Sequence, residues 1–501
     1  TGWVSGYQVR FVHPGLENPL ILVLLNGAPS FSFTLYFVFP DTFISKPTFR
    51  DETMNEILRD LKIEIIPIDA LKPYARNARK HSKKQIAQIA DSMREFGWTL
   101  PILIDEHKNI IAGHGRVEAA KLLKVKNGPV IRIEGLSEQQ IKLLRITDNK
   151  LAENSEWDFE ALKLEISELL DGELNIDPRV TGFEMAEFDI LLGESADEEA
   201  GKDEIVASDF EGPTIARPDD LFILDGRHRL FCGSALEERS YQTLMDGAQA
   251  CFCFTDPPYN VPIDGNVSGL GRKKHGDFSM ASGEMSREQF TTFLADSFRL
   301  IAANSVGGAI IDVCMDYKHM IEVITAGEGA FGELKNVCVW TKRNGGMGSL
   351  YRSAHEFVLV FKSGKGKHTN NVQLGRYGRN RTNVWPYAGV NSFGSNRAAA
   401  LAMHPTVKPT ALVADAILDC SNHKDIVLDP FAGSGTIFIA AHRTKRRAYA
   451  IELDPNYVDV CLRRFRRVTG IDPVHAQSGQ KLCDMENERN QQGSDFQSGE
   501  K

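Results

Sequence analysis

The sequence lacks an unbroken apolar run of the length that a membrane-spanning helix needs. Its most apolar stretch, residues 20–40, is interrupted by Asn26, Gly27 and Pro29. That stretch also lacks the basic start and the small-residue end of a signal peptide. The sequence therefore predicts a cytoplasmic protein that has no membrane as a partner.

Cysteine pairs and histidine clusters of the kinds that hold metal ions are also missing. The eight cysteines are scattered, and none belongs to a C-x-x-C pair or to a histidine-spaced zinc pattern. This spacing excludes a disulfide-rich scaffold and a zinc finger. We expect reduced, mostly buried thiols and no bound metal.

A basic excess is lacking as well, because 58 lysines and arginines stand against 67 acids, for a net charge of -9. A negative total does not exclude a nucleic-acid partner, since binding needs only a local basic surface. The composition, with 42% hydrophobic and 25% charged residues, is that of a globular protein. A chain of 501 residues is long enough for about three domains.

The domain organisation follows from changes along the chain. We interpret residues 1–53 as an extension that is either upstream sequence or not native, because orderly helical sequence begins only at Met54. Residues 54–155 predict a small α+β domain that contains a helix from Ser82 to Phe96. Residues 156–215 predict a helical segment and then a linker, because eleven acids and one base occupy residues 184–211.

Residues 216–476 alternate short β-branched or aromatic runs with helical segments. The predicted strands are 250–254, 308–313, 337–340, 357–361, 426–428 and 448–451. Strands separated by helices in this way indicate an α/β, Rossmann-like, doubly wound domain with a mostly parallel sheet. The polar residues 477–501 predict a disordered tail.

The tetrapeptide Asp256-Pro257-Pro258-Tyr259 directly follows the apolar strand 250–254, and strand ends are where ligands bind in open α/β sheets. The two prolines fix the backbone and leave carbonyl groups that can point at a ligand. One carboxylate and one aromatic face beside them suit a flat heterocycle that carries an amino group. A bare D-P-P tripeptide is more often only a turn, so the interpretation also depends on a second motif.

The second motif runs from Asp429 to Thr436, between a predicted strand and a predicted helix. Its glycines, Gly433 and Gly435, allow the backbone to approach a ligand closely, and the helix N-terminus can receive an anionic group. The next strand ends at Glu452, whose carboxylate can accept hydrogen bonds from ribose hydroxyls. Since the lysine of a P-loop is absent, the motif predicts a site for an adenosyl ligand.

Together the motifs resemble those of the β-class amino-methyltransferases of DNA, in which the catalytic motif precedes the cofactor motif. The segment from His404 to Pro409 is similar to the one with which that family covers its cofactor, and residues 340–343 and 355–361 resemble its later strands. The resemblance covers residues 216–476 and departs from the family at Ser234, where an acid often meets the adenine of the cofactor. It implies a metal-free enzyme that transfers a methyl group from S-adenosyl-L-methionine to an exocyclic amine of DNA.

The resemblance also implies which residues act. The catalytic residues are Asp256, Pro257, Pro258 and Tyr259, and the cofactor-binding residues are Asp429, Phe431, Gly433, Gly435, Thr436, Glu452, Thr406 and Lys408. The target base must leave the stacked duplex before it can react. Asp256 and the Pro257 carbonyl then accept the two amine hydrogens while Tyr259 stacks on the ring, so that catalysis is mostly positioning and electrostatics.

A basic segment lies between residues 340 and 383, where nine lysines and arginines stand against the single acid Glu356. We expect double-stranded DNA as the partner and this segment as the target-recognition region, although a charged run is more often only a solvated face. A second basic run, residues 272–274, lies just beyond Tyr259. The predicted DNA contacts are Arg272, Lys273, Lys274, Lys342, Arg343, Arg352, Lys362, Arg376, Arg379 and Arg381.

Residues 63–151 resemble the ParB N-terminal domain through Asn77-Ala-Arg-Lys, Gly97-Trp98 and Ala112-Gly-His-Gly-Arg. Residues 113–116 stand where that family binds a nucleotide with Gly-Glu-Arg-Arg, and His114 and Gly115 depart from it. The resemblance implies a DNA-binding accessory domain, with a nuclease or a nucleotide-dependent switch as alternatives. The sequence leaves a homodimer and a restriction partner open.

The choice of target base rests on the first motif residue. Aspartate at that position is commoner among the adenine enzymes of the family, which favours the N6 amine of adenine. Two alternatives stay open. One is the N4 amine of cytosine, which fits the same acceptors, and the other is a ParB-like DNA-binding protein whose methyltransferase half is inert.

Overall fold

The computed structural model describes residues 61–171, 176–193, 209, 211–261, 283–342, 350–388 and 407–498, and the antiparallel strands β1 (Gly2–Val4), β2 (Tyr7–Val12) and β3 (Leu20–Leu24). The interpretation of residues 1–53 as an extension otherwise lies outside the described residues. Within the described part of the chain, no helix has the length and apolar character that crossing a membrane requires.

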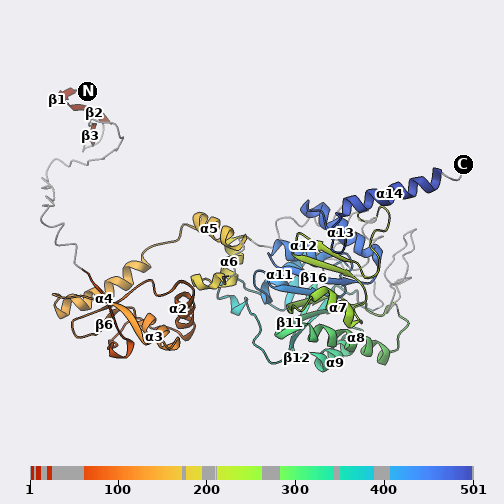
Figure 1. Ribbon diagram of the computed structural model, residues 1–501, viewed down its shortest axis with the longest axis horizontal. Helices are drawn as coiled ribbons and strands as arrows, with labels where there is room; N and C mark the ends of the chain where they lie inside the picture. The colour runs from red at the N-terminus through yellow and green to blue at the C-terminus, as the bar shows by residue number, and fades with distance from the viewer. Residues whose placement is uncertain are drawn as a thin grey trace.

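The first domain is a four-stranded sheet packed against helices (Figure 1). Across the sheet its strands are β4 (Ile63–Pro67), β7 (Asn127–Arg132), β5 (Ile102–Ile104) and β6 (Ile110–Ala112). Its helices are α2 (Lys83–Phe96), α3 (His114–Leu122) and α4 (Glu138–Glu153), with the 3-10 turn η1 (Ile68–Ala70). Helix α2 is the one predicted from Ser82 to Phe96; the Ser82 side chain caps it by accepting a hydrogen bond from the Gln85 amide, and Gly97 follows the last turn with a positive φ.

Two helices and a 3-10 turn lie between the first domain and the largest part of the molecule (Figure 1). They are α5 (Phe159–Asp171), η2 (Pro178–Thr181) and α6 (Met185–Leu191). Ile166 and Leu170 pack against Met185 and Phe188 in a small core of their own. Part of the segment that we expected to be a linker is therefore folded.

The largest part is built on a ten-stranded mixed sheet in the order β14-β12-β13-β11-β10-β15-β16-β9-β8-β17. In chain order its strands are β8 (Leu221–Leu224), β9 (His228–Cys232), β10 (Ala250–Thr255), β11 (Ser305–Met315), β12 (Gly332–Thr341), β13 (His355–Ser363), β14 (Val384–Pro386), β15 (Ile426–Asp429), β16 (Arg447–Glu452) and β17 (Val474–His475). The central strands β11, β10, β15, β16 and β9 are parallel, as predicted. Strands β13, β8 and β17 make the antiparallel pairings at the two sides.

Helices cover both faces of this sheet. They are α7 (Glu238–Met245), α8 (Arg287–Ala303), α9 (Met320–Ala330), α11 (Thr410–Cys420), α12 (Thr436–Arg443), α13 (Pro455–Thr469) and α14 (Leu482–Ser498), with the 3-10 turn η4 (Gln373–Gly375). Successive side chains of β10 point to opposite faces, because Phe252 and Phe254 join the core with α11, α12 and α13 whereas Cys253 joins the core with α7, α8 and α9. This burial on two faces explains the nearly continuous apolar strands and confirms the α/β fold class.

Helix α14 occupies much of the segment that we expected to be a disordered tail. Leu482 is fully buried at its start, and Glu486 accepts hydrogen bonds from Arg463 and Arg466 of α13 at 2.8 and 2.9 Å. The prediction of a disordered tail rested on polar composition alone. It did not include the apolar residue and the two ion pairs that hold this helix in place.

Ion pairs join the three parts. Lys84 of α2 lies 2.7 Å from the Glu184 carboxylate, next to α6, and donates a hydrogen bond to the Tyr377 hydroxyl at 3.0 Å. Asp189 of α6 pairs at 2.9 Å with Arg446, which directly precedes β16, and both side chains are buried. The middle segment is thus attached to both neighbours.

Candidate active site

The tetrapeptide that begins at Asp256 directly follows β10, at the carboxyl edge of the parallel strands, as the sequence predicts. Asn260 closes this turn with a φ of 50°. Its buried side chain accepts a hydrogen bond from the Gly283 amide at 3.0 Å and donates one to the Met285 carbonyl at 2.9 Å. Asn260 therefore holds the end of the turn against the segment that leads into α8, a role that the sequence analysis did not identify.

Four charged side chains and one tyrosine meet at this edge. Lys408 Nζ lies 2.5 Å from Asp256 Oδ2 and 3.3 Å from Glu356 Oε2. The Tyr259 hydroxyl donates a hydrogen bond to Asp256 Oδ1 at 2.8 Å. Lys342 Nζ pairs with the other carboxylate oxygen of Glu356, Oε1. Two ammonium groups and two carboxyl groups thus balance one another in a mostly buried cluster.

Burial and charge set the protonation of this cluster. Burial raises the pKa of Asp256 above its ordinary value, although the Lys408 ammonium opposes the shift. Burial would raise the pKa of Glu356 too, but Lys408 and Lys342 bring it below its ordinary value. Burial disfavours the charged form of Lys408, yet the two carboxylates raise its pKa. At neutral pH the lysine is charged and Glu356 is ionised, and Asp256 is the carboxyl group whose proton affinity the site raises.

Lys408, expected to cover the cofactor, reaches the catalytic motif instead with its ammonium group. Its backbone carbonyl lies 3.5 Å from Thr436 Oγ1, at the start of α12. The residue therefore connects the catalytic motif with the glycine-rich turn. Thr406, assigned to the same cover, lies outside the described residues.

The glycine-rich turn connects β15 to α12, as predicted. Gly433 and Gly435 have φ values of 53° and 75°, which favour glycine. Buried Arg464 of α13 donates hydrogen bonds to the Ser434 carbonyl at 2.9 Å and to Thr436 Oγ1 at 3.0 Å. A buried arginine therefore fixes the turn from behind, and the sequence analysis did not identify it.

Two buried carboxyl groups flank the turn. Glu452 accepts hydrogen bonds from the Gly433 amide at 2.8 Å and the Asp454 amide at 2.9 Å, and Asp429 accepts one from the Phe431 amide at 3.1 Å. Burial raises the pKa of Asp429 to about 8 and that of Glu452 to about 7. Among the residues that the structure describes, no lysine or arginine pairs with either group. Buried acceptors without a cation suit a ligand that brings hydroxyl donors and a positive charge, which fits S-adenosyl-L-methionine.

The structure does not place every predicted DNA contact on the surface. Arg379 and Arg381 are mostly buried and both pair with Asp415 and Asp419 of α11, over distances of 2.6 to 3.2 Å. Arg381 also donates a hydrogen bond to the Tyr387 hydroxyl at 2.5 Å. These two guanidinium groups hold the chain between η4 and β14 against α11, so the structure gives them an internal role where we expected contacts to DNA.

Lys362 is another predicted contact that lies away from the catalytic edge. Strand β13 runs antiparallel to β11, with Phe357 opposite Met315 and Lys362 opposite Ile310. Glu356 therefore starts β13 at the catalytic edge, whereas Lys362 ends it toward the other edge and lies 3.5 Å from Glu333.

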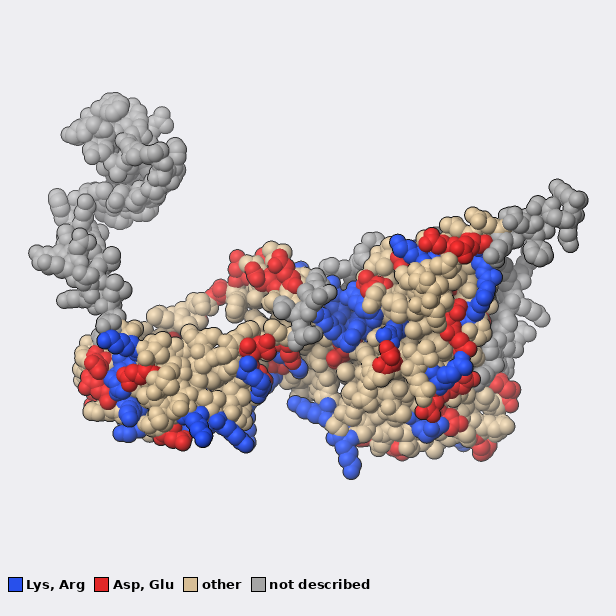
Figure 2. All heavy atoms as spheres, viewed as in Figure 1, with Lys and Arg blue, Asp and Glu red and all other residues tan. Residues whose placement is uncertain are grey.

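The remaining predicted contacts differ in exposure. Lys342 is partly buried by its pairing with Glu356, whereas Arg352 and Arg376 are exposed. On the face drawn in Figure 2, basic and acidic side chains are interspersed over both domains, apart from a gathering of basic side chains beside the middle segment. The other predicted contacts, Arg272, Lys273, Lys274 and Arg343, lie outside the described residues.

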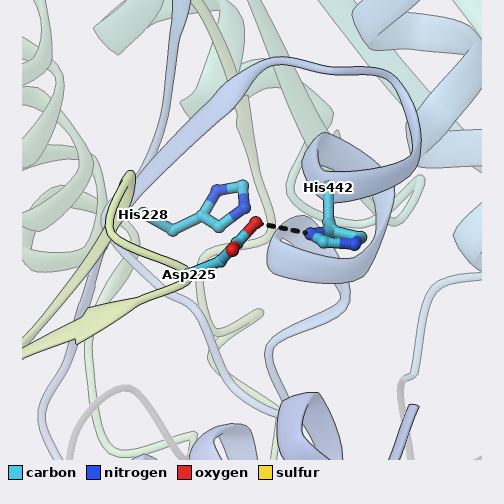
Figure 3. Close-up of side chains that lie close together, drawn as sticks. All are labelled: Asp225, His228 and His442. Carbon is cyan, nitrogen blue, oxygen red and sulfur yellow. Dashed lines mark ion pairs between the residues drawn. The ribbon is translucent and has the colours of Figure 1, made fainter. Parts of the chain in front are cut away.

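One cluster has the residue types of a metal site. Asp225, His228 and His442 have potential ligand atoms within 4.8 Å of one another, at the β8–β9 turn and the end of α12 (Figure 3). However, Asp225 pairs with Arg227, and His442 Nδ1 lies 3.3 Å from the same carboxylate. The Ala448 amide donates to His228 Nδ1 at 3.0 Å, so Nε2 of the neutral ring carries the hydrogen and offers no lone pair. These bonds favour an ion-pair network over a metal site.

The turn of the first domain that resembles a nucleotide site has a packing requirement. Gly113 has a φ of 99° and directly precedes α3. A Cβ at Gly115 would lie 2.9 Å from Ile89 Cδ1 of α2. The absence of a side chain at Gly115 therefore lets the Ile89 side chain of α2 lie close to the backbone of α3, and a larger residue there would require Ile89 to shift.

Three family profiles match successive parts of the chain. Residues 251–463 match the N6/N4 profile described as DNA methylase, and residues 52–150 match the ParB N-terminal domain. Residues 160–218 match the ParB-methyltransferase HTH domain. The third match covers the segment that we interpreted as helices and a linker, and it accounts for the folded helices α5 and α6.

The similar proteins divide in the same way. The ParB-like nuclease domain-containing protein YnaK from Escherichia coli (strain K12) is 55% identical over 80 residues, which are 16% of this chain and 92% of that protein. The type II methyltransferase M.HpaI from Haemophilus parainfluenzae is 28% identical over 269 residues, which are 49% of this chain and 77% of that protein.

Among solved structures, the complex of M1.HpyAVI with SAM is 21% identical in sequence and has a TM-score of 0.35. The match covers 47% of this chain and 97% of the M1.HpyAVI chain. The PvuII DNA methyltransferase, described as cytosine-N4-specific, is 18% identical, covers 49% of this chain and 90% of its own, and has a TM-score of 0.36. The profile matches thus identify residues 251–463 as an N6/N4 DNA methylase domain and residues 52–150 as a ParB N-terminal domain ahead of it.

Proposed function

We propose that this DNA methylase transfers the methyl group of S-adenosyl-L-methionine to the N6 amine of adenine in DNA. The observation that carries the proposal is the pairing of β10 with β15, in which Cys253 lies opposite Leu428. The pairing brings Asp256, just after β10, and the glycine-rich turn, just after β15, to the same edge of the sheet. A base site beside a cofactor site allows direct transfer between two positioned ligands.

The base site consists of the catalytic tetrapeptide. Asp256 and the carbonyl of Pro257 accept the hydrogens of the target amine, and Pro258 fixes the backbone in the orientation that this requires. Tyr259 stacks on the base after the base has left the duplex. Lys408 lies against Asp256 and favours the ionised carboxylate, which burial alone would disfavour.

The cofactor site consists of the glycine-rich turn and its two carboxyl groups. Glu452 accepts hydrogen bonds from the ribose hydroxyls, and Asp429 compensates the positive charge. The N-terminus of α12, at Thr436, receives the carboxylate of the methionine part. When bound, S-adenosyl-L-methionine supplies the methyl group.

DNA is proposed to approach the carboxyl edge of the sheet. Exposed Arg352 and the partly buried Lys342 lie just before β13 and just after β12, where both strands reach that edge. Arg343 and residues 272–274 follow elements that end at the same edge, which makes them further candidates. The match of residues 251–463 to a profile described as DNA methylase supports a DNA substrate.

The first domain is proposed to be a DNA-binding accessory. The middle segment that follows it, residues 160–218, matches a ParB-methyltransferase HTH domain, and helix-turn-helix units place a helix on DNA. A DNA-binding unit directly after the first domain supports an accessory role for both. The name of YnaK includes a nuclease domain. Within residues 61–150, the structure brings no group of three His, Cys, Asp or Glu side chains together, which favours the accessory role over a nuclease.

The test is a transfer assay with the purified full chain and S-adenosyl-L-methionine that carries a tritiated methyl group. DNA is digested to nucleosides after the reaction, and the label is located by chromatography. We expect the label in N6-methyladenine and no transfer by Asp256→Asn. Label in N4-methylcytosine would overturn the choice of base, and no label in either nucleoside would overturn the proposed activity.

A further inference from the structure

Both oxygens of the Asp256 carboxylate are held by donors of the protein itself. Tyr259 occupies Oδ1 at 2.8 Å and Lys408 occupies Oδ2 at 2.5 Å. The amine of a target base needs one of these oxygens, so it competes with a hydroxyl and an ammonium group that are already in place.

Glu356 offers a second acceptor to both of these donors. Its Oε2 lies 3.3 Å from Lys408 Nζ and 3.4 Å from the Tyr259 hydroxyl. Glu356 lies at the start of β13, directly opposite Trp340 of β12, and its side chain is 14% exposed. Lys342 holds the other oxygen of the carboxylate, so Oε2 stays directed at the two donors.

We propose that Glu356 is a positioning residue that receives Lys408 and the Tyr259 hydroxyl when the target amine takes their place on Asp256. The inference rests on the proposed function, since it assigns Asp256 to the amine. In this arrangement Lys408 occupies the position of the amine while no base is bound.

The charge balance of the cluster keeps the free-energy cost of this exchange low, even though the site is buried. When Asp256 is ionised, it and Glu356 carry two negative charges, which the ammonium groups of Lys408 and Lys342 balance. Moving Lys408 from one carboxylate to the other therefore leaves every ion with a counter-ion. An ion without a counter-ion would be strongly destabilising in a buried site. Among the residues that the structure describes, Asp256 would be the one carboxylate left to pair with Lys408 without Glu356, and the base would have to break that pair to enter.

A purely structural role for Glu356 is the competing interpretation. In that case its loss lowers stability and does not change how the base enters. The two roles separate in a base-entry measurement, for which 2-aminopurine is placed directly beside the target adenine once sequencing of modified DNA has given the recognition sequence. Its fluorescence rises when the target adenine leaves the stack.

The experiment compares Glu356→Gln with a matched control, Glu333→Gln. Glu333 lies on the neighbouring strand β12, pairs with Lys362 and is exposed, away from the catalytic edge. We expect Glu356→Gln to weaken binding of the flipped base by at least about tenfold and to raise the KM for DNA, with unchanged affinity for S-adenosyl-L-methionine. Glu333→Gln should behave as the wild type. Glu356→Asp keeps the charge and replaces the glutamine variant if that variant does not fold.

A double-mutant cycle with Lys408→Met then tests the mechanism. If Glu356 acts by receiving Lys408, Glu356→Gln should have little further effect on base entry once Lys408 is absent. Equal effects in both backgrounds, or base entry by Glu356→Gln equal to that of Glu333→Gln, would overturn the inference. A wild-type protein that transfers no methyl group to DNA would instead overturn the proposed function, and the inference would fall with it.

Discussion

At the scale of single residues, we propose that Asp256 carries the chemistry. As the acceptor for the hydrogens of the reacting amine, it would make its contribution mainly in the transition state. We predict that Asp256→Ala lowers kcat by about 10²-fold or more, while the affinity for S-adenosyl-L-methionine stays near that of the wild type. Steady-state kinetics together with calorimetry check this. A near-normal kcat would remove Asp256 from the mechanism.

Glu452 predicts a pH dependence of cofactor binding. Burial raises its pKa to about 7, and only the ionised carboxylate accepts hydrogen bonds from two ribose hydroxyls. Affinity for S-adenosyl-L-methionine should therefore rise as the pH increases from about 6 to about 8, with release of a proton on binding. The Glu452→Gln variant should bind more weakly and with a smaller pH dependence. Calorimetry across this pH range measures both, and identical pH profiles for the two proteins would contradict the assignment.

The same shift has the opposite sign for stability. Between the pKa that Glu452 has in the unfolded chain and a pH of about 7, the carboxyl group keeps its proton in the native state but has lost it in the unfolded chain. In the absence of ligand, this carboxyl group therefore opposes folding increasingly as the pH rises through that window. Cofactor binding favours the ionised form of Glu452, whereas folding without the cofactor favours the protonated form, and such shifted pKa values are common at functional sites.

Sequence reasoning at this scale identified the residues that belong to motifs. Asp256, Tyr259 and Glu452 lie where the motifs predict, at the ends of β10 and β16. Glu356 was missed as a site residue, although it is the single acid in a basic segment. Its role depends on Lys408, which is distant in sequence and becomes a neighbour only in the folded sheet.

At the scale of helices and strands, the basic segment of residues 340–383 does not form one continuous surface. Its residues are divided among the catalytic edge, the far end of β13 and the surface of α11, because β13 runs antiparallel to β11 and carries the chain across the sheet. A local count of charges cannot detect this division. Nor can it detect Asp415 and Asp419, which come from a helix formed later in the chain and neutralise Arg379 and Arg381.

This division predicts different outcomes for two arginines of the same segment. Arg381→Ala leaves two mostly buried carboxylates to share the Arg379 guanidinium, so one buried negative charge lacks a counter-ion and we expect a loss of stability of about 3 to 5 kcal/mol. Arg352→Ala changes an exposed side chain, so we expect little loss of stability but weaker DNA binding, with a salt slope reduced by about one. Denaturant unfolding and salt titrations of DNA binding measure both effects. A reversed outcome would return Arg381 to the DNA contacts.

The glycine-rich turn also shows the limit of element-level reasoning. A motif predicts that Gly435 lets the backbone approach a ligand. The structure shows that a Cβ there would lie 2.9 Å from Cys461 Sγ of α13, so the glycine permits helix packing. A Gly435→Val variant would therefore damage the fold as well as the site, and Glu452→Gln is the cleaner test of cofactor binding.

At the scale of the whole molecule, the middle segment with helices α5 and α6 connects the first domain to the methylase domain. Its Asp189 pairs with Arg446 inside the methylase domain, and Lys84 of the first domain reaches Glu184 and Tyr377. Composition indicated a linker because acids dominate the segment. Asp189 is one of those acids, and its burial against a basic residue far along the chain could not be read from a local count.

We predict that Asp189→Ala destabilises the methylase domain by about 3 to 5 kcal/mol, because it removes the carboxylate from a buried guanidinium. A matched control is Asp91→Ala, which breaks an exposed pair with Arg94 on α2 and should cost less than about 1 kcal/mol. Denaturant unfolding of the two variants provides the comparison. Equal stabilities would show that the middle segment is not anchored through Asp189.

Most of the architecture was predictable because buried parallel strands and glycine turns leave local patterns in the sequence. The strands that carry the two motifs were predicted within a residue or so at each end. The antiparallel flank, the folded middle segment and helix α14 were not, since they depend on contacts between distant residues. The same division holds for the site, where motif residues were predicted and the ion pairs around them were not.

The central claim is that this chain methylates the N6 amine of adenine in DNA through Asp256. The most direct measurement is modified-base sequencing of DNA from cells that express the wild type, with cells that express Asp256→Ala as the control. The account predicts N6-methyladenine within one recurrent sequence in the first sample and its absence from the second. Methylation of cytosine instead, or equal methylation in both samples, would contradict it.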